Sequence, residues 1–125
     1  MDDKNQKGED NMEDCIFCKI IKKELPSEPV YEDNEILAFK DINPVAPVHI
    51  LVIPKKHLNS INDLSAQDAQ VIGNIFLIIK KLAAELGIAD TGYRVVVNTG
   101  ADGGQQVGHL HYHLIGGKPL GTKIC

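Results

Sequence analysis

The sequence has little of what nucleic-acid-binding and membrane proteins depend on. It contains no tryptophan and only 5% aromatic residues, so a surface on which bases could stack is not expected. Its net charge is −4, and no basic stripe is present to follow a phosphate backbone. The longest unbroken apolar run, residues 75–79, is far too short to span a bilayer. We therefore expect neither a nucleic acid nor a membrane as a partner.

Cysteines are also few, and they lie only at Cys15, Cys18 and Cys125. A small, odd number of cysteines argues against a disulfide framework. Residues 1–13 are polar and charged, and they lack the apolar centre of a secretion signal. We expect a disordered tail over residues 1–13, one domain over residues 14–125, and a cytoplasmic location.

The hydrophobic pattern predicts two helices and about five strands. The expected elements are a short helix (Cys15 to Lys23), a hairpin (Val30 to Glu32 and Ile36 to Lys40), a buried strand (His49 to Ile53), a long helix (Ser65 to about Leu86) and two further strands (Tyr93 to Asn98 and His109 to Ile115). One long helix beside a set of hairpin-like strands indicates an α+β fold with an antiparallel sheet. The strand–helix alternation of a parallel sheet is not present.

The long helix has more apolar positions than one small sheet can bury. These positions cover more than one helical stripe, and they include Val71, Ile72, Ile75, Phe76, Leu77, Ile78, Ile79, Leu82, Ala83 and Leu86. The surplus favours a second contact with a partner subunit. The alternative is a helix buried deeply within its own core.

Three of the five histidines alternate along the last predicted strand. His109, His111 and His113 then share one face, while the apolar Leu110 and Leu114 share the other with Tyr112. We expect a solvated row of imidazoles, about 6–7 Å apart, that surrounds one ligand. A neutral imidazole is a nucleophile, and its neighbours can protonate a leaving group. A metal site or an incidental polar face are the rival interpretations.

A glycine-rich loop, residues 100–104, precedes this strand. Gly100, Gly103 and Gly104 permit positive φ and a close backbone approach. The amide groups of such a loop can donate to phosphate oxygens. This signal alone is weak, since most glycine loops only turn the chain. Together with the histidines, it points to chemistry at phosphorus.

The segment His109-Leu-His-Tyr-His-Leu-Ile115 resembles the His-φ-His-φ-His-φ-φ signature of the histidine triad (HIT) superfamily, where φ is apolar. Supporting segments are residues 31–41, 49–57 and 93–105. The resemblance extends from about Cys15 to Gly117 and is strongest to the Hint branch, the purine nucleoside phosphoramidases. It implies a HIT-like fold that pairs as a homodimer through the long helix and a sheet edge.

The resemblance also implies a role for each matching residue. His111 would be the nucleophile, with its second ring nitrogen bound to a backbone carbonyl, and His113 would assist the leaving group. The other two members of the active-site histidine set would be His49 and His109. Asn98, Gln105 and the amides near Val107 would hold phosphate oxygens, and Asp41 would accept the ribose hydroxyls. The apolar slot for the base would be formed by Ile16, Phe17, Ile20, Phe39 and Ile42.

The sequence departs from the Hint pattern in two places. Gln106 stands where a serine commonly contacts the leaving-group side, so rate and substrate preference are open. The chain also ends eight residues after Gly117, without the aromatic-bearing tail that shapes specificity in some relatives.

The close pair Cys15 and Cys18 has the spacing of zinc ligands but needs two further donors. His57 and His109 are the candidates, and the resemblance supports a structural Zn²⁺ at these positions. A redox pair and two ordinary reduced thiols are the alternatives. A zinc-bound His109 could not also donate to a phosphate, so zinc would leave catalysis to His111, His113 and His49.

The leading hypothesis is hydrolysis of the P–N bond of purine nucleoside 5′-monophosphoramidates, AMP or GMP joined to an amine or to lysine. The reaction would proceed through a covalent nucleotidyl-histidine and would need no cofactor for its chemistry. One alternative is a dinucleoside polyphosphate hydrolase or nucleotidyl transferase. Another is a nucleotide-binding interaction module with little turnover.

Overall fold

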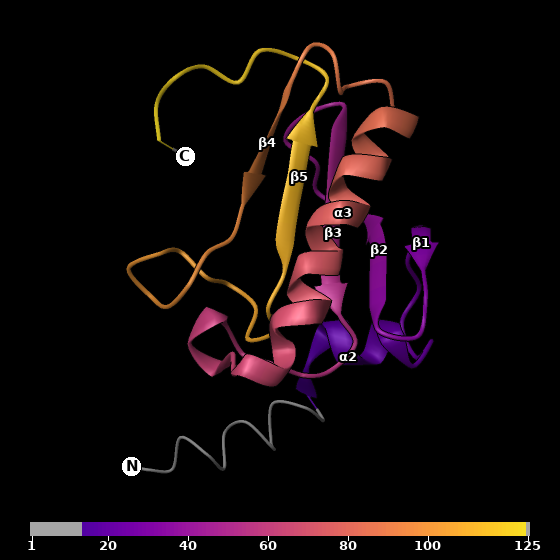
Figure 1. The fold of residues 1–125 in the computed structure, drawn as a ribbon, viewed down its shortest axis with the longest axis vertical. Helices are drawn as coiled ribbons and strands as arrows, with labels where there is room; N and C mark the ends of the chain where they lie inside the picture. Colours follow the sequence, from indigo (N-terminus) through magenta and orange to yellow (C-terminus); the bar gives the residue numbers. More distant parts are fainter. Residues whose placement is uncertain (1–13, 125) are drawn as a thin grey trace.

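The computed structural model describes residues 14–124, so the predicted tail over residues 1–13 lies outside the described residues. The elements in chain order are α2 (Ile16–Ile21), β1 (Pro29–Glu32), β2 (Ile36–Lys40), β3 (Val48–Pro54), the 3₁₀ turns η1 (Ile61–Asp63) and η2 (Ala66–Asp68), α3 (Ala69–Glu85), β4 (Tyr93–Val96) and β5 (Tyr112–Gly116). The strands form one antiparallel sheet in the order β1-β2-β3-β5-β4. Helix α3 lies across one face of this sheet (Figure 1). The predicted α+β architecture is confirmed.

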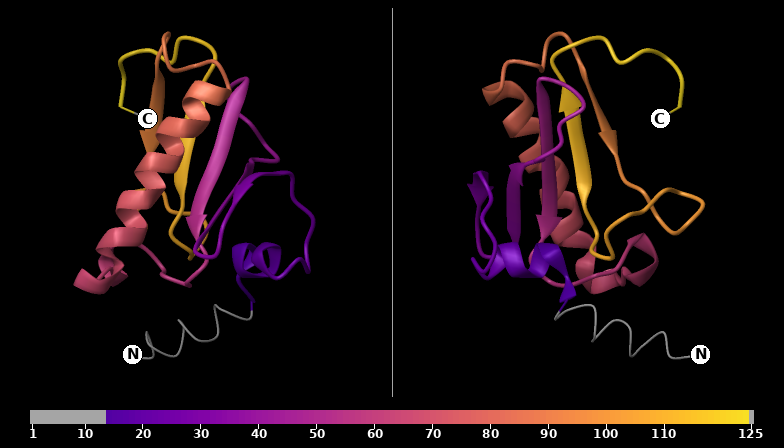
Figure 2. Two further views of the ribbon diagram at one scale, coloured as in Figure 1. Left: turned by 45° about the vertical axis from the view of Figure 1, so that its right-hand side comes forward. Right: turned by 180° about the vertical axis from the view of Figure 1, so that it is seen from behind.

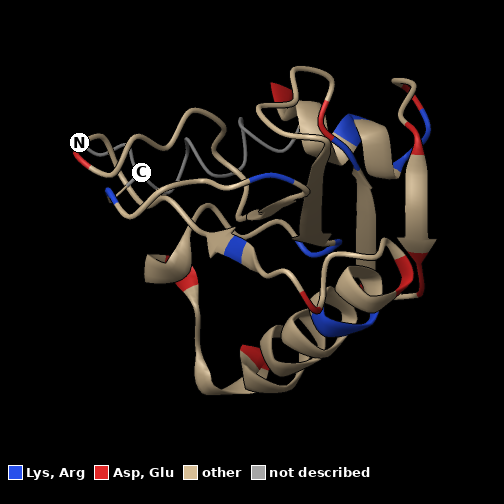
Figure 3. Cartoon of the chain, turned by 90° about the horizontal axis from the view of Figure 1, so that it is seen from above, with Lys and Arg blue, Asp and Glu red and all other residues tan. Residues whose placement is uncertain are grey.

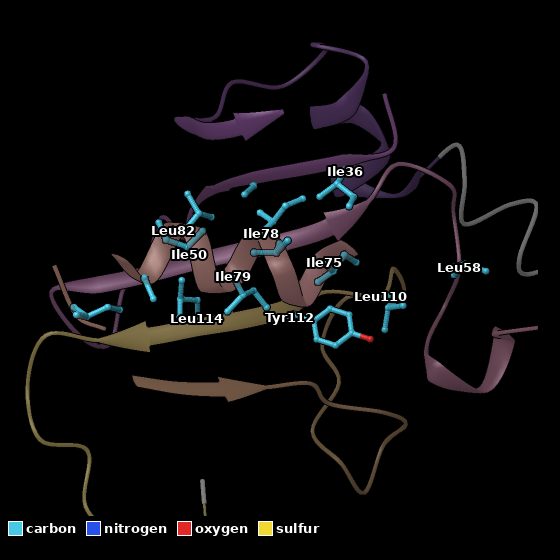
Figure 4. Packing of buried hydrophobic residues seen from close by; sticks show 14 residues of the cluster. Ile36, Ile50, Leu58, Ile75, Ile78, Ile79, Leu82, Leu110, Tyr112 and Leu114 are labelled. Carbon is cyan, nitrogen blue, oxygen red and sulfur yellow. The ribbon is translucent and has the colours of Figure 1, made fainter. Parts of the chain in front are cut away.

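The central strands β2 and β3 are apolar on both faces because each face is covered by a helix. The even-numbered residues of both strands, such as Ile36 and Ile50, pack against α3 in the larger core (Figure 4). The odd-numbered residues, such as Phe39 and Leu51, pack against α2 in a smaller core. Figure 2 shows α2 on the opposite side of the sheet from α3. The functional side chains described below lie on the α2 side.

The expected start of the long helix is nearly correct. Ser65 lies at the boundary, and its backbone N–H and hydroxyl both donate to the Asp68 carboxylate, at 3.0 and 3.2 Å. The first turn is the 3₁₀ turn η2, and α-helical geometry begins only at Ala69. Tightened first turns are common at helix ends. The helix ends at Glu85, and Gly87 follows with a φ of +78°.

The surplus apolar face of α3 is exposed in the single chain. Ile75 and Ile79 are almost completely buried, whereas Phe76 is 50% and Leu77 65% exposed. The interpretation that α3 is buried all round within its own core is therefore wrong. Strand β4 forms an open edge of the sheet next to β5. Pairing with a second subunit stays a prediction.

The last strand begins three residues later than expected. Strand pairing with β3 stops at Val52 and Tyr112, so His109 and His111 precede β5. The carbonyl of Pro54, which could otherwise continue the ladder, accepts instead from the His109 side chain at 2.9 Å. Leu110 N–H donates to the Leu58 carbonyl beyond the strand. A side chain thus replaces a backbone partner at this end of the sheet.

Charged residues are interspersed over the fold. Figure 3 shows Lys and Arg as well as Asp and Glu in several parts of the described chain, and the net charge of the whole sequence is −4. No helix among the described residues is long and apolar enough to cross a bilayer.

Candidate active site

A cavity of about 300 Å³ lies on the α2 side of the sheet, beside the glycine-rich loop. It collects residues from α2, the end of β2, β3, the loop and the final strand. Its lining residues are Phe17, Asp41, Leu51, Asn98, Gly104, Gln106, Val107, His111 and His113. Seven of these are predicted site residues, namely all but Leu51 and Gly104. The other predicted site residues do not line the cavity.

His111 is oriented by a backbone hydrogen bond. Its Nδ1 lies 2.7 Å from the His109 carbonyl oxygen, which can only accept, so Nδ1 carries the proton. The neutral ring then presents an unprotonated Nε2, and the side chain lines the cavity. Burial lowers the pKa of His111, although the bond to the His109 carbonyl opposes the shift. This is the arrangement that a nucleophilic imidazole requires.

His113, which lines the cavity, forms a hydrogen-bonded pair with His49 behind it. The Val45 N–H donates to Nδ1 of His49 at 3.2 Å, which places the His49 proton on Nε2. That Nε2 lies 2.9 Å from Nδ1 of His113 and 3.4 Å from the Asp41 carboxylate. His113 therefore accepts at Nδ1 and carries its own proton on Nε2. Burial and the neighbouring His111 and His49 lower the pKa of His113 to about 4.

The glycine-rich loop is shaped as the residues predict. Gly100 and Gly104 have φ values of +73° and +79°, which favour glycine. A Cβ on Gly103 would lie 2.3 Å from the Thr99 carbonyl oxygen, so this turn has no room for a side chain. Nδ2 of Asn98 donates to the Gly103 carbonyl at 2.8 Å. Asn98 thus supports the loop as well as lining the cavity.

Gln105 does not line the cavity. Its Nε2 donates to the carbonyls of Asn59 and Val107, at 2.6 and 2.9 Å, and its Oε1 accepts from Gly100 N–H at 2.9 Å. The side chain is fully occupied in fastening the loop to the segment before η1. Its neighbour Gln106 is exposed and lines the cavity.

The expected apolar slot for a base is assembled only in part. Phe17 lines the cavity and packs edge-on against His111, with ring centroids 5.1 Å apart. Phe39 and Ile20 lie behind Phe17 in the smaller core. Ile16 is 51% and Ile42 87% exposed, so neither is packed into a formed slot in the described protein.

A second cluster, formed by Cys15, Cys18, His57 and His109, lies under α2. Their ligand atoms are all within 4.8 Å of one another. Nδ1 of His57 is 3.1 Å from the Cys18 sulfur, and Nδ1 of His109 is 3.4 Å from Cys15 and 3.6 Å from Cys18. Tetrahedral zinc with ordinary bond lengths separates a sulfur and a nitrogen ligand by about 3.5 Å. The spacing of the cluster therefore fits a zinc ion.

The hydrogen bonds around the cluster also fit a metal. Nε2 of His109 donates to the Pro54 carbonyl, and Nε2 of His57 lies 2.8 Å from the Asn59 amide oxygen. Both acceptors hold the proton on Nε2 and leave the Nδ1 lone pairs facing the two sulfurs. Such outer partners are typical of histidine ligands. Two thiols and two neutral imidazoles form a donor set that suits Zn²⁺.

His109 is thereby separated from the cavity. Its side chain is completely buried. Its Nδ1 faces the Cys15 sulfur, and its Nε2 donates to the Pro54 carbonyl. His111 is 6% exposed, and only His113 is half-buried. The expected solvated row of three imidazoles around one ligand is therefore wrong. The cavity brings together His111 and His113, with His49 behind them. The apolar row on the other face, including Leu110 and Leu114, packs against α3 as predicted.

Sequence reasoning missed several supporting residues. Leu51 lines the cavity, and its alternation with Ile50 along β3 was an available signal. The acceptors Pro54 and Asn59 fix two imidazoles, and Val45 fixes a third. No local pattern marks these three residues, because their contacts depend on how distant segments fold together.

The cavity thus combines an unprotonated imidazole nitrogen, a second imidazole with a proton to donate, and a glycine loop. This combination can carry out nucleophilic displacement with proton transfer to a leaving group.

Comparison with known proteins agrees with this chemistry. The HIT domain family matches residues 22–120. A purine nucleoside phosphoramidase of Escherichia coli (strain K12) is 49% identical over 113 residues, which cover 90% of this chain and 95% of that protein. A HIT family hydrolase from Clostridium thermocellum has a TM-score of 0.87 and 51% identity, covering 90% of this chain and 98% of the other. A histidine triad protein from Clostridium difficile has a TM-score of 0.85 and 52% identity, covering 89% and 96%. The chain therefore belongs to the HIT domain family and is a hydrolase of that family.

Proposed function

We propose that this chain hydrolyses the P–N bond of purine nucleoside 5′-monophosphoramidates, in which AMP or GMP is joined to an amine or to lysine. The observation that carries the proposal is the orientation of His111: its Nδ1–H is bound by the His109 carbonyl, so its lone pair on Nε2 is available at the cavity. The similarity to the Escherichia coli purine nucleoside phosphoramidase supports the choice of substrate.

In the proposed first step, Nε2 of His111 attacks phosphorus and the P–N bond breaks. The electron pair of that bond goes to the departing nitrogen, which takes the Nε2 proton from the imidazolium form of His113 and leaves that ring neutral. The negative phosphate and the nearby Asp41 both favour the protonated form of His113 in the complex, against the burial that lowers its pKa in the free protein. The products are a free amine and a nucleotidyl-histidine.

In the second step, water attacks phosphorus and the bond to His111 breaks. The electron pair returns to Nε2 of His111, the water proton passes to His113, and AMP or GMP is released. Asn98 and the amides near Val107 would hold the phosphate oxygens, and Gln106 would contact the leaving-group side. Asp41 would accept the ribose hydroxyls, with Phe17 against the base.

The test compares an adenosine phosphoramidate with a dinucleoside polyphosphate on the wild type and on His111→Ala. We expect hydrolysis of the phosphoramidate, loss of turnover in the variant, and retained AMP binding. A nucleotidyl-histidine should be trapped on the wild type by acid-free quenching and mass spectrometry. Full activity of His111→Ala would refute the mechanism. Preference for the polyphosphate would favour a polyphosphate hydrolase, and binding without turnover would favour an interaction module.

Zn²⁺ is proposed at Cys15, Cys18, His57 and His109 as a structural ion, and the reaction steps above do not involve it. Elemental analysis of protein purified without chelator should find one zinc per chain. The absence of zinc, with both thiols freely titratable, would remove this assignment.

A homodimer is proposed through α3 and the open edge at β4. The exposed Phe76 and Leu77 support it, because an apolar helix face of this kind is typical of a subunit interface. Sedimentation of the wild type should give a dimer, and Leu77→Glu should give a monomer. An unchanged sedimentation coefficient for the variant would exclude this face.

A further inference from the structure

The metal-ligand cluster and the nucleophile share a residue. The side chain of His109 belongs to the cluster, while its backbone carbonyl accepts the Nδ1–H of His111 at 2.7 Å. Only Leu110 separates the two histidines in the chain. Any change in the backbone of His109 therefore moves the acceptor that orients the His111 ring.

A second path connects the cluster to the cavity through α2. Cys15 is the N-cap of this helix, and its sulfur accepts the Cys18 N–H at 3.3 Å. Between the two cysteines lies Phe17, which lines the cavity. Its ring packs edge-on against both His109 and His111, with centroids 5.9 and 5.1 Å away.

Helix α2 has little to hold it in place by itself. It contains six residues, well below the length at which an isolated helix is stable in water. It pairs with no strand and is attached to the sheet by its apolar contacts and by the two cysteines. A metal bound by Cys15 and Cys18 on α2 and by His57 and His109 outside it would fasten the helix to the rest of the protein.

We propose that metal loading of the Cys15–Cys18–His57–His109 cluster controls nucleotide binding, by holding the His109 carbonyl against His111 and by seating Phe17 at the cavity. His109 is then a positioning residue for the nucleophile. This inference rests on the proposed function for the identity of the nucleotide. It gives the cluster a task beyond general stability of the fold.

The experiment uses the full chain, stripped of metal with a chelator and reloaded with Zn²⁺. AMP affinity is measured by calorimetry, and the His111 tautomer is measured by long-range ¹⁵N NMR of the imidazole. We expect AMP to bind about tenfold more weakly to the stripped protein, the equivalent of losing one oriented contact. His111 should change from a single Nδ1–H tautomer to a mixture. One equivalent of Zn²⁺ should restore both.

Two variants separate this coupling from general destabilisation. Cys15→Ser keeps an N-cap oxygen for the Cys18 N–H but removes a soft metal ligand, so it should resemble the stripped protein even in the presence of Zn²⁺. Leu82→Ala weakens the core on the opposite face of the sheet, and it should lose stability without losing AMP affinity or the His111 tautomer.

Three results would overturn the proposal. One is a stripped protein that binds AMP as tightly as the loaded protein, with the same His111 tautomer. Another is failure of the wild type to take up one Zn²⁺. The third is complete loss of circular dichroism on stripping, since the metal would then act on the whole fold. If loaded protein binds AMP in a zinc-dependent way but cleaves no phosphoramidate, the proposed function fails and the coupling stands.

Discussion

Gln105→Ala tests whether this side chain acts on the loop or on the substrate. Gln105 makes three hydrogen bonds, which join the loop at Gly100 and Val107 to the segment at Asn59. The substitution removes all three and leaves two carbonyls and one N–H without their partner. The glycine loop should then open more often, even when no nucleotide is bound.

The size of the effect follows from the environment of each bond. A hydrogen bond within a protein contributes about 1 kcal/mol net. The Gly100 N–H is exposed, so water replaces Gln105 there at little cost, while the two bonds from Nε2 are partly buried. The loss is therefore about 2 kcal/mol in the free energy of loop opening, or about a 30-fold larger opening constant. Global stability should fall by less, because the loop opens locally.

Amide hydrogen exchange of the nucleotide-free protein measures this opening directly. Loop amides of Gln105→Ala should exchange about 30-fold faster than those of the wild type, with α3 unchanged. Gln106→Ala is the matched control, since Gln106 is exposed and its side chain has no hydrogen bond within the described residues. Unchanged exchange in Gln105→Ala, together with weaker nucleotide binding, would show that Gln105 contacts the phosphate directly.

Three further predictions concern the loop, the cavity and the core. Gly103→Ala should weaken AMP binding about tenfold in a calorimetric titration, because its Cβ would lie 2.3 Å from a backbone oxygen; normal affinity would show that the loop adapts. NMR titration of His113 should give a midpoint near pH 4. The free energy of unfolding should decrease as the pH falls from 6.5 toward 4, because His113 binds its proton in the unfolded chain at a higher pH than in the folded protein. A midpoint at 6.5 would contradict the burial of His113. Leu82→Ala should cost about 2–5 kcal/mol in urea unfolding, because Leu82 is 2% exposed; a loss below about 1 kcal/mol would mean that the core collapses around the gap.

The elements were predictable where the pattern is local. The apolar run of β2, the turn at Asp33 and the helical period of α3 all depend on neighbours within a few residues. Asp33 accepts from the N–H groups of Glu35 and Ile36, as an Asp in a turn commonly does. The alternation of histidines with apolar residues along the last predicted strand also placed Leu110 and Leu114 on the core side correctly.

The errors have a common physical origin in long-range contacts. The start of β5 depends on the Pro54 carbonyl, which lies 55 positions from the side chain that occupies it. The exposure of Ile42 and the task of Gln105 depend on where a loop lies after folding. A residue pattern gives the side on which a histidine lies, but it does not give the atoms that surround the ring.

The contrast between His109 and His111 shows why those surroundings decide the chemistry. The two residues are identical, two positions apart, and buried on the same side of the sheet. Nε2 of His109 donates to the Pro54 carbonyl, so the lone pair of this ring is on Nδ1, close to the thiols under α2. Nδ1 of His111 donates to the His109 carbonyl, so the lone pair of this ring is on Nε2, the nitrogen farther from the backbone. One backbone oxygen for each ring therefore directs the His109 lone pair to the sulfurs of Cys15 and Cys18 and the His111 lone pair to the cavity, although the motif itself does not distinguish the two rings.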